Sequence, residues 1–542
     1  MTRAFDYIII GSGSAGAVIA AQLSEGPDIS VLLLEAGPPN RHPLQNMPLA
    51  FPRVAAGRIG TWQYLSEPEP GLNGRQLPIP RGRTLGGTSA INAMIAIRGN
   101  ARDYDGWAAM GCEGWSYAEL LPYFRKLETS WRGPSDFHGA DGPVHISRME
   151  GSDMLWEPLL ASAQAAGIVY CEDANGAQQD GISRMEATVD DGVRSSTARA
   201  YLQPARHRPN LTILTGALAR RIVIERGRAT GIEFLRGGLI HTAHAEREII
   251  LSGGAYGSPQ LLMLSGIGDP DELSAVGIAP LHELPGVGRN LADHPNIIND
   301  YALTGDEGLT RHLRADRAAL SALRWLATRS GPFACTGTSA NIFARTLDGL
   351  AQPDVQMMCL PISGEAQVWV PGLQRKPPSR ISVRTGFLHP KSRGWVKLRS
   401  ADPRDAPRIF NNMFAEPGDL DGMVRALKLS RDIHTQSPLR DMIRSEILPG
   451  PDVRSDGEIR DYIRANASHR SHPVGTCRMG NDTDAVVDPS LRVRGIEGLR
   501  VADASIMPSI PSGNTNLPCI MIGEKAADLI LKRPESGTST SV

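Results

Sequence analysis

The stretch Tyr7-Ile8-Ile9-Ile10-Gly11-Ser12-Gly13-Ser14-Ala15-Gly16 decides the fold. Its apolar start reads as a strand that is buried on both faces, and a glycine-rich turn follows at once. The small residues of 17–23 favour a helix, and the apolar segment 29–34 is a second strand that ends at Glu35. This order of strand, GxGxxG, helix, strand and acid is typical of a Rossmann-like dinucleotide site.

Each part of this motif has a physical task. Gly11 permits the tight turn, Gly13 lets a pyrophosphate approach the backbone, and Gly16 lets the helix pack on the strand. The helix N-terminus presents free N–H groups to phosphates, and Glu35 would accept hydrogen bonds from ribose hydroxyls. The motif does not distinguish NAD from FAD. The alternative is an ordinary strand–helix turn that binds no dinucleotide. One such fingerprint predicts one tightly held cofactor that passes its electrons outside the protein.

Length and composition limit the classes of protein to which this chain can belong. A chain of 542 residues can build two large units, and its 41% hydrophobic and 21% charged residues are ordinary for a globular protein. A net charge of −1 gives no field that would recruit nucleic acid. The six cysteines form no CxxC pair, so we expect no metal site. With no signal peptide and no transmembrane run, we predict a cytoplasmic protein; its oligomeric state stays open.

Three later parts of the chain resemble signatures of the glucose–methanol–choline (GMC) oxidoreductases. They are 81–92 (RGRTLGGTSAIN), 252–262 (SGGAYGSPQLL) with 293–295 (DHP), and 472–480 (HPVGTCRMG) with 512–516 (SGNTN). The matches are correctly ordered and spread over nearly the whole chain, and they look nearest to bacterial choline dehydrogenase-like and alcohol oxidase members. The segment 300–380 is the least recognisable, and family members choose their substrates there.

The resemblance implies an α/β fold with a Rossmann-like FAD-binding domain and an α+β substrate-binding domain, an antiparallel sheet plus helices, over the flavin. From the motif positions we assign 1–150, 195–300 and 455–533 to the FAD-binding domain, 151–194 and 301–454 to the substrate-binding domain, and 534–542 to a flexible tail. Expected strands are 211–215, 221–225, 248–252, 381–387 and 394–399, and expected helices are 318–330 and 420–436.

The cofactor that the resemblance implies is FAD. The residues expected to hold it are Gly11, Gly13, Ser14, Ala15, Gly16, Glu35, Ala36, Arg83, Gly86, Gly87, Asn92, Ala93, Met94, Ile95, Ala219, Asp503, Ala504, Thr515 and Asn516. Some members attach FAD covalently through a histidine just before the asparagine of the first signature. Ile91 stands there and has no nucleophile, so we expect non-covalent FAD.

The resemblance also implies that His472 and Asn514 are the catalytic pair. Alcohol oxidation removes a proton from oxygen, for which a near-neutral histidine base is suited, and a hydride from carbon, which flavin N5 takes. Asn514 would donate its amide N–H to the developing alkoxide. We therefore expect oxidation of a primary alcohol to an aldehyde, with electrons passed to O2 or a quinone-type acceptor. The alternative is a non-oxidative relative, hydroxynitrile lyase-like or decarboxylase-like.

Four further residues also need an interpretation. His469 is an alternative base, three residues before His472, and His294 is interpreted as structural. Ser471 stands where many relatives carry a bulky residue, which predicts a roomy, polar pocket for ring-bearing or branched primary alcohols. Arg470 is expected to be a solvated surface charge rather than a group that meets an anionic substrate.

Overall fold

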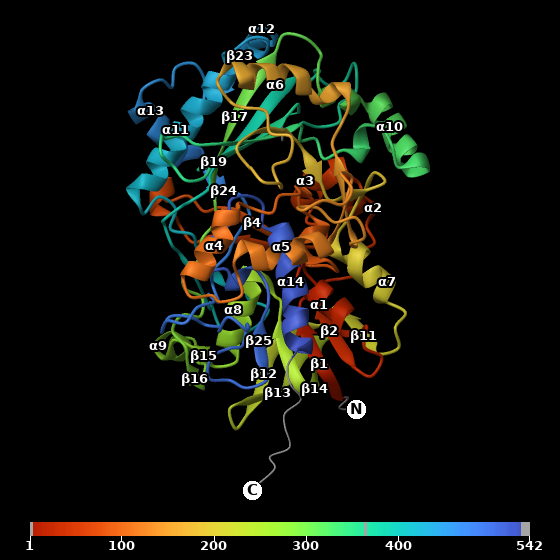
Figure 1. Cartoon of the computed structure of the whole chain (residues 1–542), viewed down its shortest axis with the longest axis vertical. Helices are drawn as coiled ribbons and strands as arrows, with labels where there is room; N and C mark the ends of the chain where they lie inside the picture. The colour runs from red at the N-terminus through yellow and green to blue at the C-terminus, as the bar shows by residue number, and fades with distance from the viewer. Residues whose placement is uncertain (1–3, 363–365, 533–542) are drawn as a thin grey trace.

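Two large sheets form the frame of the molecule. The computed structural model describes residues 4–362 and 366–532, so the predicted tail 534–542 lies outside the described residues. Within these ranges, Figure 1 shows two stacked halves, each built around one seven-stranded sheet. The predicted α/β class is confirmed. No helix in the described part of the chain has the length and apolarity needed to cross a membrane.

The first sheet, in the lower half of Figure 1, is the Rossmann-like unit. Its strand order is β11 (Leu211–Thr215), β2 (Val31–Glu35), β1 (Ala4–Ile10), β14 (Leu239–Leu251), β13 (Arg228–Arg236) and β12 (Leu218–Glu225), with β25 (Leu499–Val501) beside the end of β14. Strands β11, β2, β1 and the end of β14 run parallel. Helix α1 (Gly16–Leu23) packs against α14 (Asn516–Leu531), which joins the two ends of the chain.

The second sheet, in the upper half, is antiparallel. Its order is β23 (Ile443–Leu448), β17 (Pro295–Leu303), β20 (Arg380–Phe387), β19 (Val355–Leu360), β18 (Ala340–Ala344) and β7 (Gly181–Arg184), with β24 (Ser468–His469) paired to β17. Helix α11 (Pro417–His434) covers one face, where Ile381 and Val383 share a core with Ala426 and Ile433. Because side chains alternate along a strand, the residues between them lie on the opposite face of the sheet.

The remaining elements connect and cover these sheets. The helices are α2 (Pro43–Asn46), α3 (Phe51–Ala56), α4 (Ala101–Ala109), α5 (Tyr117–Lys126), α6 (Trp156–Ala165), α7 (Gln203–Ala205), α8 (Gly254–Leu264), α9 (Pro270–Ala275), α10 (Ala315–Thr328), α12 (Leu439–Met442) and α13 (Asp456–Asn466). The strands are β3 (Thr61–Leu65), β4 (Pro78–Gly82), β5 (Glu128–Ser130), β6 (Val144–Arg148), β8 (Glu186–Ala187), β9 (Val189–Asp190), β10 (Val193–Arg194), β15 (Ile267–Gly268), β16 (His282–Glu283), β21 (Trp395–Lys397) and β22 (Arg408–Phe410).

The expected elements overlap the observed ones with shifts at their ends. The five expected strands fall on β11, β12, the end of β14, β20 and β21, and the two expected helices fall on α10 and α11. The domain division stays a prediction. Strand β17 crosses the boundary assigned at residue 300, and β24 joins the second sheet although 455–533 was assigned to the FAD-binding domain.

Candidate active site

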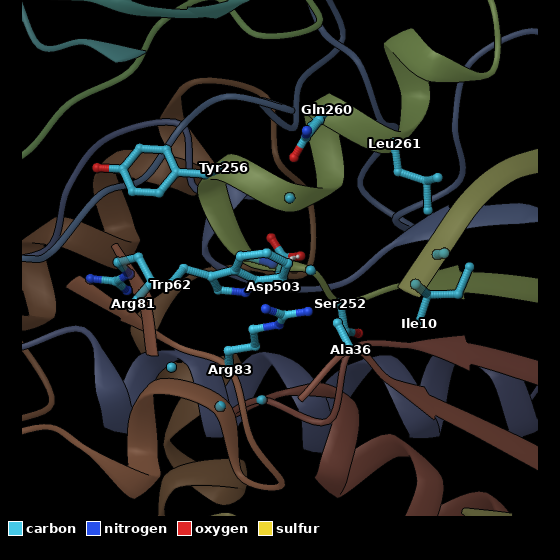
Figure 2. A pocket seen from close by; sticks show the side chains of 18 of the residues that line it. Ile10, Ala36, Trp62, Arg81, Arg83, Ser252, Tyr256, Gln260, Leu261 and Asp503 are labelled. Atoms are coloured by element: carbon cyan, nitrogen blue, oxygen red, sulfur yellow. Dashed lines mark hydrogen bonds between the residues drawn. The ribbon is translucent and has the colours of Figure 1, made fainter. Parts of the chain in front are cut away.

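A cavity of about 450 Å³ opens at the carboxyl ends of β1 and β2 (Figure 2). Crevices at this edge of a parallel sheet are the usual place for a dinucleotide. Of the residues predicted to bind the cofactor, the cavity is lined by Gly11, Gly13, Ser14, Ala15, Glu35, Ala36, Arg83, Gly87, Ala219, Asp503 and Ala504. Gly16, Gly86, Asn92, Ala93, Met94, Ile95, Thr515 and Asn516 do not line it.

The glycines of the first motif divide into those that pack and those that leave space. A side chain at Gly11 would collide with the Ser252 carbonyl, and one at Gly16 would collide with the Gly11 carbonyl. A Cβ added to Gly13 would meet nothing closer than Ser252 O at 4.0 Å, so the cavity reaches its backbone. These observations fit a backbone approach to a pyrophosphate.

Glu35 is held firmly at the end of β2. Its Oε2 accepts from the Ser12 amide (3.1 Å) and hydroxyl (2.6 Å), and Oε1 accepts from Gly37 N at 2.8 Å. Burial raises the pKa of Glu35, while the hydrogen bonds from Ser12 and Gly37 oppose that rise. Each carboxylate oxygen can accept more than one hydrogen bond, so ribose hydroxyls remain compatible with this site.

Several residues that line the cavity were not among the predicted cofactor-binding residues. Trp62, Arg81, Tyr256 and Gln260 line the same space as Arg83. The Arg83 guanidinium lies 4.2 Å from the centre of the Trp62 ring, and Arg83 Nε and Tyr256 Oη have no hydrogen-bond partner among the described residues. Such buried, unsatisfied groups beside a cavity are expected where a polar ligand belongs. Tyr256 lies inside the second signature and could have been found, whereas Trp62 has no motif around it.

The buried side chain of Arg194 donates hydrogen bonds to the loop of the first signature. Arg194 Nη1 donates to Asn92 Oδ1 at 2.8 Å and to Ser89 O at 3.2 Å, and Asn92 Oδ1 also accepts from Met94 N at 3.0 Å. Desolvation lowers the pKa of Arg194 to about 9. Ile91 packs in a small apolar cluster. Arg194 lies far from the signature in sequence, and nothing in its own segment signalled this contact.

Ser14 connects the glycine-rich turn to the end of the chain. Its hydroxyl donates to Asn516 Oδ1 at 2.8 Å at the start of α14. Asp503 also bridges distant segments, because its Oδ2 accepts from Gly254 N at 2.8 Å and its Oδ1 accepts from Ser505 N at 2.8 Å. These contacts bring the motifs from the start, middle and end of the chain to one site.

The predicted catalytic pair lies together. His472 Nε2 is 3.0 Å from Asn514 Nδ2, although neither side chain lines the 450 Å³ cavity. Two contacts fix the backbone around His472: its N–H donates to Asp293 Oδ1 at 3.0 Å, and Arg81 Nη1 donates to Ser471 O at 2.8 Å. Ser471 itself adopts a left-handed conformation, with φ of 65°.

His294 determines which nitrogen of His472 carries the proton. His294 Nε2 lies 3.1 Å from the Leu388 carbonyl, which can only accept, so Nε2 of His294 is protonated. In a neutral His294, Nδ1 is then an acceptor, and the nearest donor is His472 Nδ1 at 3.1 Å. His472 is left with an unprotonated Nε2 facing Asn514. His294 was interpreted as structural, and the structure adds to this a direct contact with His472, the predicted base.

A second chain of hydrogen bonds orients Asn514. Arg470 Nη1, which can only donate, contacts Gln356 Oε1 at 2.6 Å. Gln356 Nε2 therefore donates to Asn514 Oδ1 at 3.2 Å, which turns the Asn514 amide nitrogen toward His472. Both ends of the His472–Asn514 contact are thus fixed, by Gln356 on β19 of the second sheet and by His294, which immediately precedes β17.

The expectation for Arg470 was wrong. Its side chain is not a solvated surface charge, because it points inward and donates to Asn296 Oδ1, Gln356 Oε1 and the Arg384 carbonyl. The left-handed turn at Ser471 lets successive residues point in unrelated directions. The Ser471 hydroxyl lies 3.3 Å from His469 Nδ1, so Arg470, and not Ser471, reaches the catalytic hydrogen bonds.

Electrostatics favour a neutral His472. Burial, together with the positive charges of Arg470 and Arg81, holds the pKa of His472 well below its ordinary value of 6.5. His469 has other partners: its Nε2 lies 3.0 Å from Pro78 O, and its Nδ1 accepts from Ser471 N at 3.0 Å. The geometry therefore favours His472 over His469 as the base.

Comparisons with known proteins agree with this site. Models of the GMC oxidoreductase family match residues 5–296 and 390–523. Mitochondrial choline dehydrogenase of Mus musculus is 42% identical over 98% of this chain and 90% of its own length, and oxygen-dependent choline dehydrogenase of Rhizobium johnstonii is 43% identical over 98% and 96%. Among solved structures, pyridoxine 4-oxidase from Mesorbium loti is 32% identical, with a TM-score of 0.87 over 98% of this chain and 100% of that one.

Fold, site and relatives together define an FAD-dependent oxidoreductase that acts on alcohols. The chain belongs to the GMC oxidoreductase family, as its motifs predicted. The lyase-like alternative finds no support in these comparisons.

Proposed function

We propose that this chain oxidises a small primary alcohol to an aldehyde, with His472 as the general base and Asn514 as the donor to the alkoxide. The observation that carries the proposal is the 3.0 Å contact between His472 Nε2 and Asn514 Nδ2. One atom is an unprotonated acceptor and the other a donor, as an alcohol hydroxyl requires. Relatives named for choline and pyridoxine support an alcohol substrate.

FAD, when bound, supplies the hydride acceptor. The protein's own residues handle the proton. An alcohol hydroxyl placed at the pair donates its proton to His472 Nε2 and accepts a hydrogen bond from Asn514 Nδ2. Negative charge that develops on the oxygen is stabilised by this amide, while His472 remains oriented by His294.

FAD binding draws on residues from three parts of the chain. Gly13 and Ser14 would hold the pyrophosphate, and Glu35 would hold the ribose. Asp503 would contact the ribityl chain that leads to the flavin ring. The bond between protein and cofactor is non-covalent in this proposal, because Ile91 offers no nucleophile. Electrons then pass to O2 or to a quinone-type acceptor.

Anaerobic mixing with a panel of neutral, anionic and cationic primary alcohols tests the proposal. We expect at least one alcohol to bleach the flavin absorbance, and His472→Ala to slow bleaching by ~10²–10⁴ while FAD content stays normal. His469→Ala serves as the matched control and should cost far less. If no alcohol of any charge reduced the flavin of the holoenzyme, the proposed reaction would be wrong. Steady-state rates with O2 and with an artificial quinone then identify the acceptor class.

A further inference from the structure

Two arginines beside the catalytic pair form no ion pair with a carboxylate of the described residues. Arg470 donates to the neutral acceptors Asn296 Oδ1 (3.3 Å), Gln356 Oε1 (2.6 Å) and Arg384 O (2.8 Å). Arg384 accepts through its carbonyl, but among the described residues its guanidinium has no hydrogen-bond acceptor and no ion-pair partner. Five N–H donors are therefore available on Arg384.

The register of the second sheet places Arg384 next to the site. Arg384 in β20 lies opposite Met358 in β19, and Gly386 lies opposite Gln356. Residues two apart on a strand share a face, so Arg384 and Gln356 are diagonal neighbours on the same face. Since Gln356 donates to Asn514 at 3.2 Å, the Arg384 side chain stands on the sheet surface that contacts Asn514.

Each arginine has one carboxylate whose charge acts on it, and for Arg470 that carboxylate is Asp293, but no ion pair joins them among the described residues. Asp300 is the carboxylate whose charge acts on Arg384, but Asp300 already accepts from Arg380 Nη1 at 3.2 Å and from the Ser382 hydroxyl. Burial lowers the pKa of Arg384, and burial together with the charge of Arg384 lowers the pKa of Arg470 to about 9. Arg384 keeps some accessible surface despite this burial.

Two adjacent buried cations that form no direct ion pair are costly. That cost falls when an anion enters, and a guanidinium fork matches a carboxylate in a bidentate geometry. A quaternary ammonium group in the same place would meet two like charges instead. The arrangement thus discriminates among alcohols by the charge of their non-reacting end.

We propose that the alcohol oxidised by this chain carries a carboxylate, which Arg384 binds while the hydroxyl contacts His472 and Asn514. The inference rests on the proposed alcohol oxidation and adds its substrate class. It separates this chain from relatives named for choline, whose substrate is a cation. The reaction itself is unchanged: a CH2–OH group becomes an aldehyde, and its two electrons go to FAD.

The test compares substrates matched in shape but not in charge. Choline has a neutral isostere in 3,3-dimethylbutan-1-ol, and 4-(hydroxymethyl)benzoate has one in 4-(hydroxymethyl)benzamide; 3-hydroxypropanoate and 4-hydroxybutanoate vary the spacing. We expect kcat/KM to be ~10-fold or more higher for a carboxylate than for its amide, and lower for choline than for its isostere.

Arg384→Met keeps the length of the side chain and removes its charge. We expect it to lower kcat/KM for the carboxylate alcohol by ~10-fold or more, mainly through KM, and to leave the amide nearly unchanged. Arg384→Lys should restore part of the preference. Arg444→Met is the matched control, since Arg444 is exposed on β23 of the same sheet. FAD content reports on folding in each variant.

The outcomes separate the two proposals. If neutral alcohols bleach the flavin faster than their carboxylate counterparts at every spacing, or if Arg384→Met lowers both equally, the carboxylate assignment is overturned and alcohol oxidation stands. If choline is oxidised better than its neutral isostere, the assignment is likewise wrong. If no alcohol of any charge reduces the flavin, the proposed function itself fails.

Discussion

The Nδ1 atoms of His294 and His472 lie 3.1 Å apart, in rings that meet nearly at right angles (88°). Both rings are buried, and burial is the main cause that lowers the pKa of each. With both rings neutral and Leu388 O accepting from His294, only one proton arrangement satisfies all three groups. His294 thus acts as a positioning residue that keeps His472 Nε2 free to accept a proton.

Replacing His294 should reveal this role. We expect His294→Leu to lower kcat by ~10–10², less than the loss in His472→Ala, because the base remains but its tautomer is no longer fixed. His294→Asn can still accept from His472 and donate to Leu388 O, so it should retain more activity than His294→Leu. Stopped-flow reduction rates check this order. Equal losses in both variants would point to a packing role only.

Arg470 should set the acidic limit of activity. Its charge helps to hold the pKa of His472 well below 6.5, so kcat/KM for a neutral alcohol should stay level as pH falls to 6.5. Removing the charge in Arg470→Met raises the pKa of His472. The decrease of kcat/KM on the acidic side of the pH profile, its acidic limb, should therefore move to higher pH. Arg470→Lys should return the limb toward its original position. A limb that stays in place in Arg470→Met would contradict this assignment.

The sequence alone could predict the dinucleotide unit because its physics is local. Gly11, Gly13 and Gly16 lie within six residues; close backbone contacts explain Gly11 and Gly16, and open space beside the backbone explains Gly13. His472 and Asn514 required the family resemblance, since an isolated His-Pro or Gly-Asn carries no such information. Their direct contact is a result of the tertiary fold.

The contacts of His294 and Gln356 with the catalytic pair join segments that lie far apart in the sequence. His294 is 178 residues from His472, and Gln356 is 158 residues from Asn514. Arg470 was misjudged because an arginine is usually exposed, and only the inward turn before His472 reverses that expectation. Trp62 reaches the cavity from a hairpin that has no recognisable motif.

Asn514 should contribute to the rate without supporting the fold. We expect Asn514→Ala to lower kcat by ~10²–10³, as the loss of one donor to a developing oxyanion does. Gln356→Met leaves the donor in place and frees only its orientation, so its effect should be smaller. Single-turnover rates and FAD content are the measurements. A normal rate in Asn514→Ala with full FAD content would remove Asn514 from the mechanism.

The purified protein should be yellow and should release intact FAD on denaturation. Ile91 lies in an apolar cluster where some relatives are expected to carry a linking histidine. After acid or heat treatment, the flavin should appear in the supernatant with the mass of free FAD. Flavin that remains with the precipitated polypeptide would show a covalent link through another residue.

His138 predicts a pH dependence of stability that is independent of catalysis. Burial alone would lower the pKa of this histidine, but hydrogen bonds to Asp173 (2.9 Å) and Glu128 (2.7 Å) outweigh burial and raise the pKa to about 9. The folded protein therefore holds a proton that the unfolded chain, with an ordinary histidine pKa of 6.5, releases earlier. The stabilisation is complete below pH 6.5 and is lost as pH rises through 9.

A shift of this size corresponds to a stabilisation on the order of 3 kcal/mol at low pH. His138→Gln should lower the midpoint of urea unfolding of the holoenzyme at pH 6, and the two proteins should converge at pH 9.5. His207→Gln, at an exposed histidine, is the control and should follow the wild type at both pH values. If the gap between His138→Gln and the wild type were the same at pH 6 and pH 9.5, His138 would be neutral in the folded protein, and the network around Glu128 would be held by Arg98 at 2.7 Å.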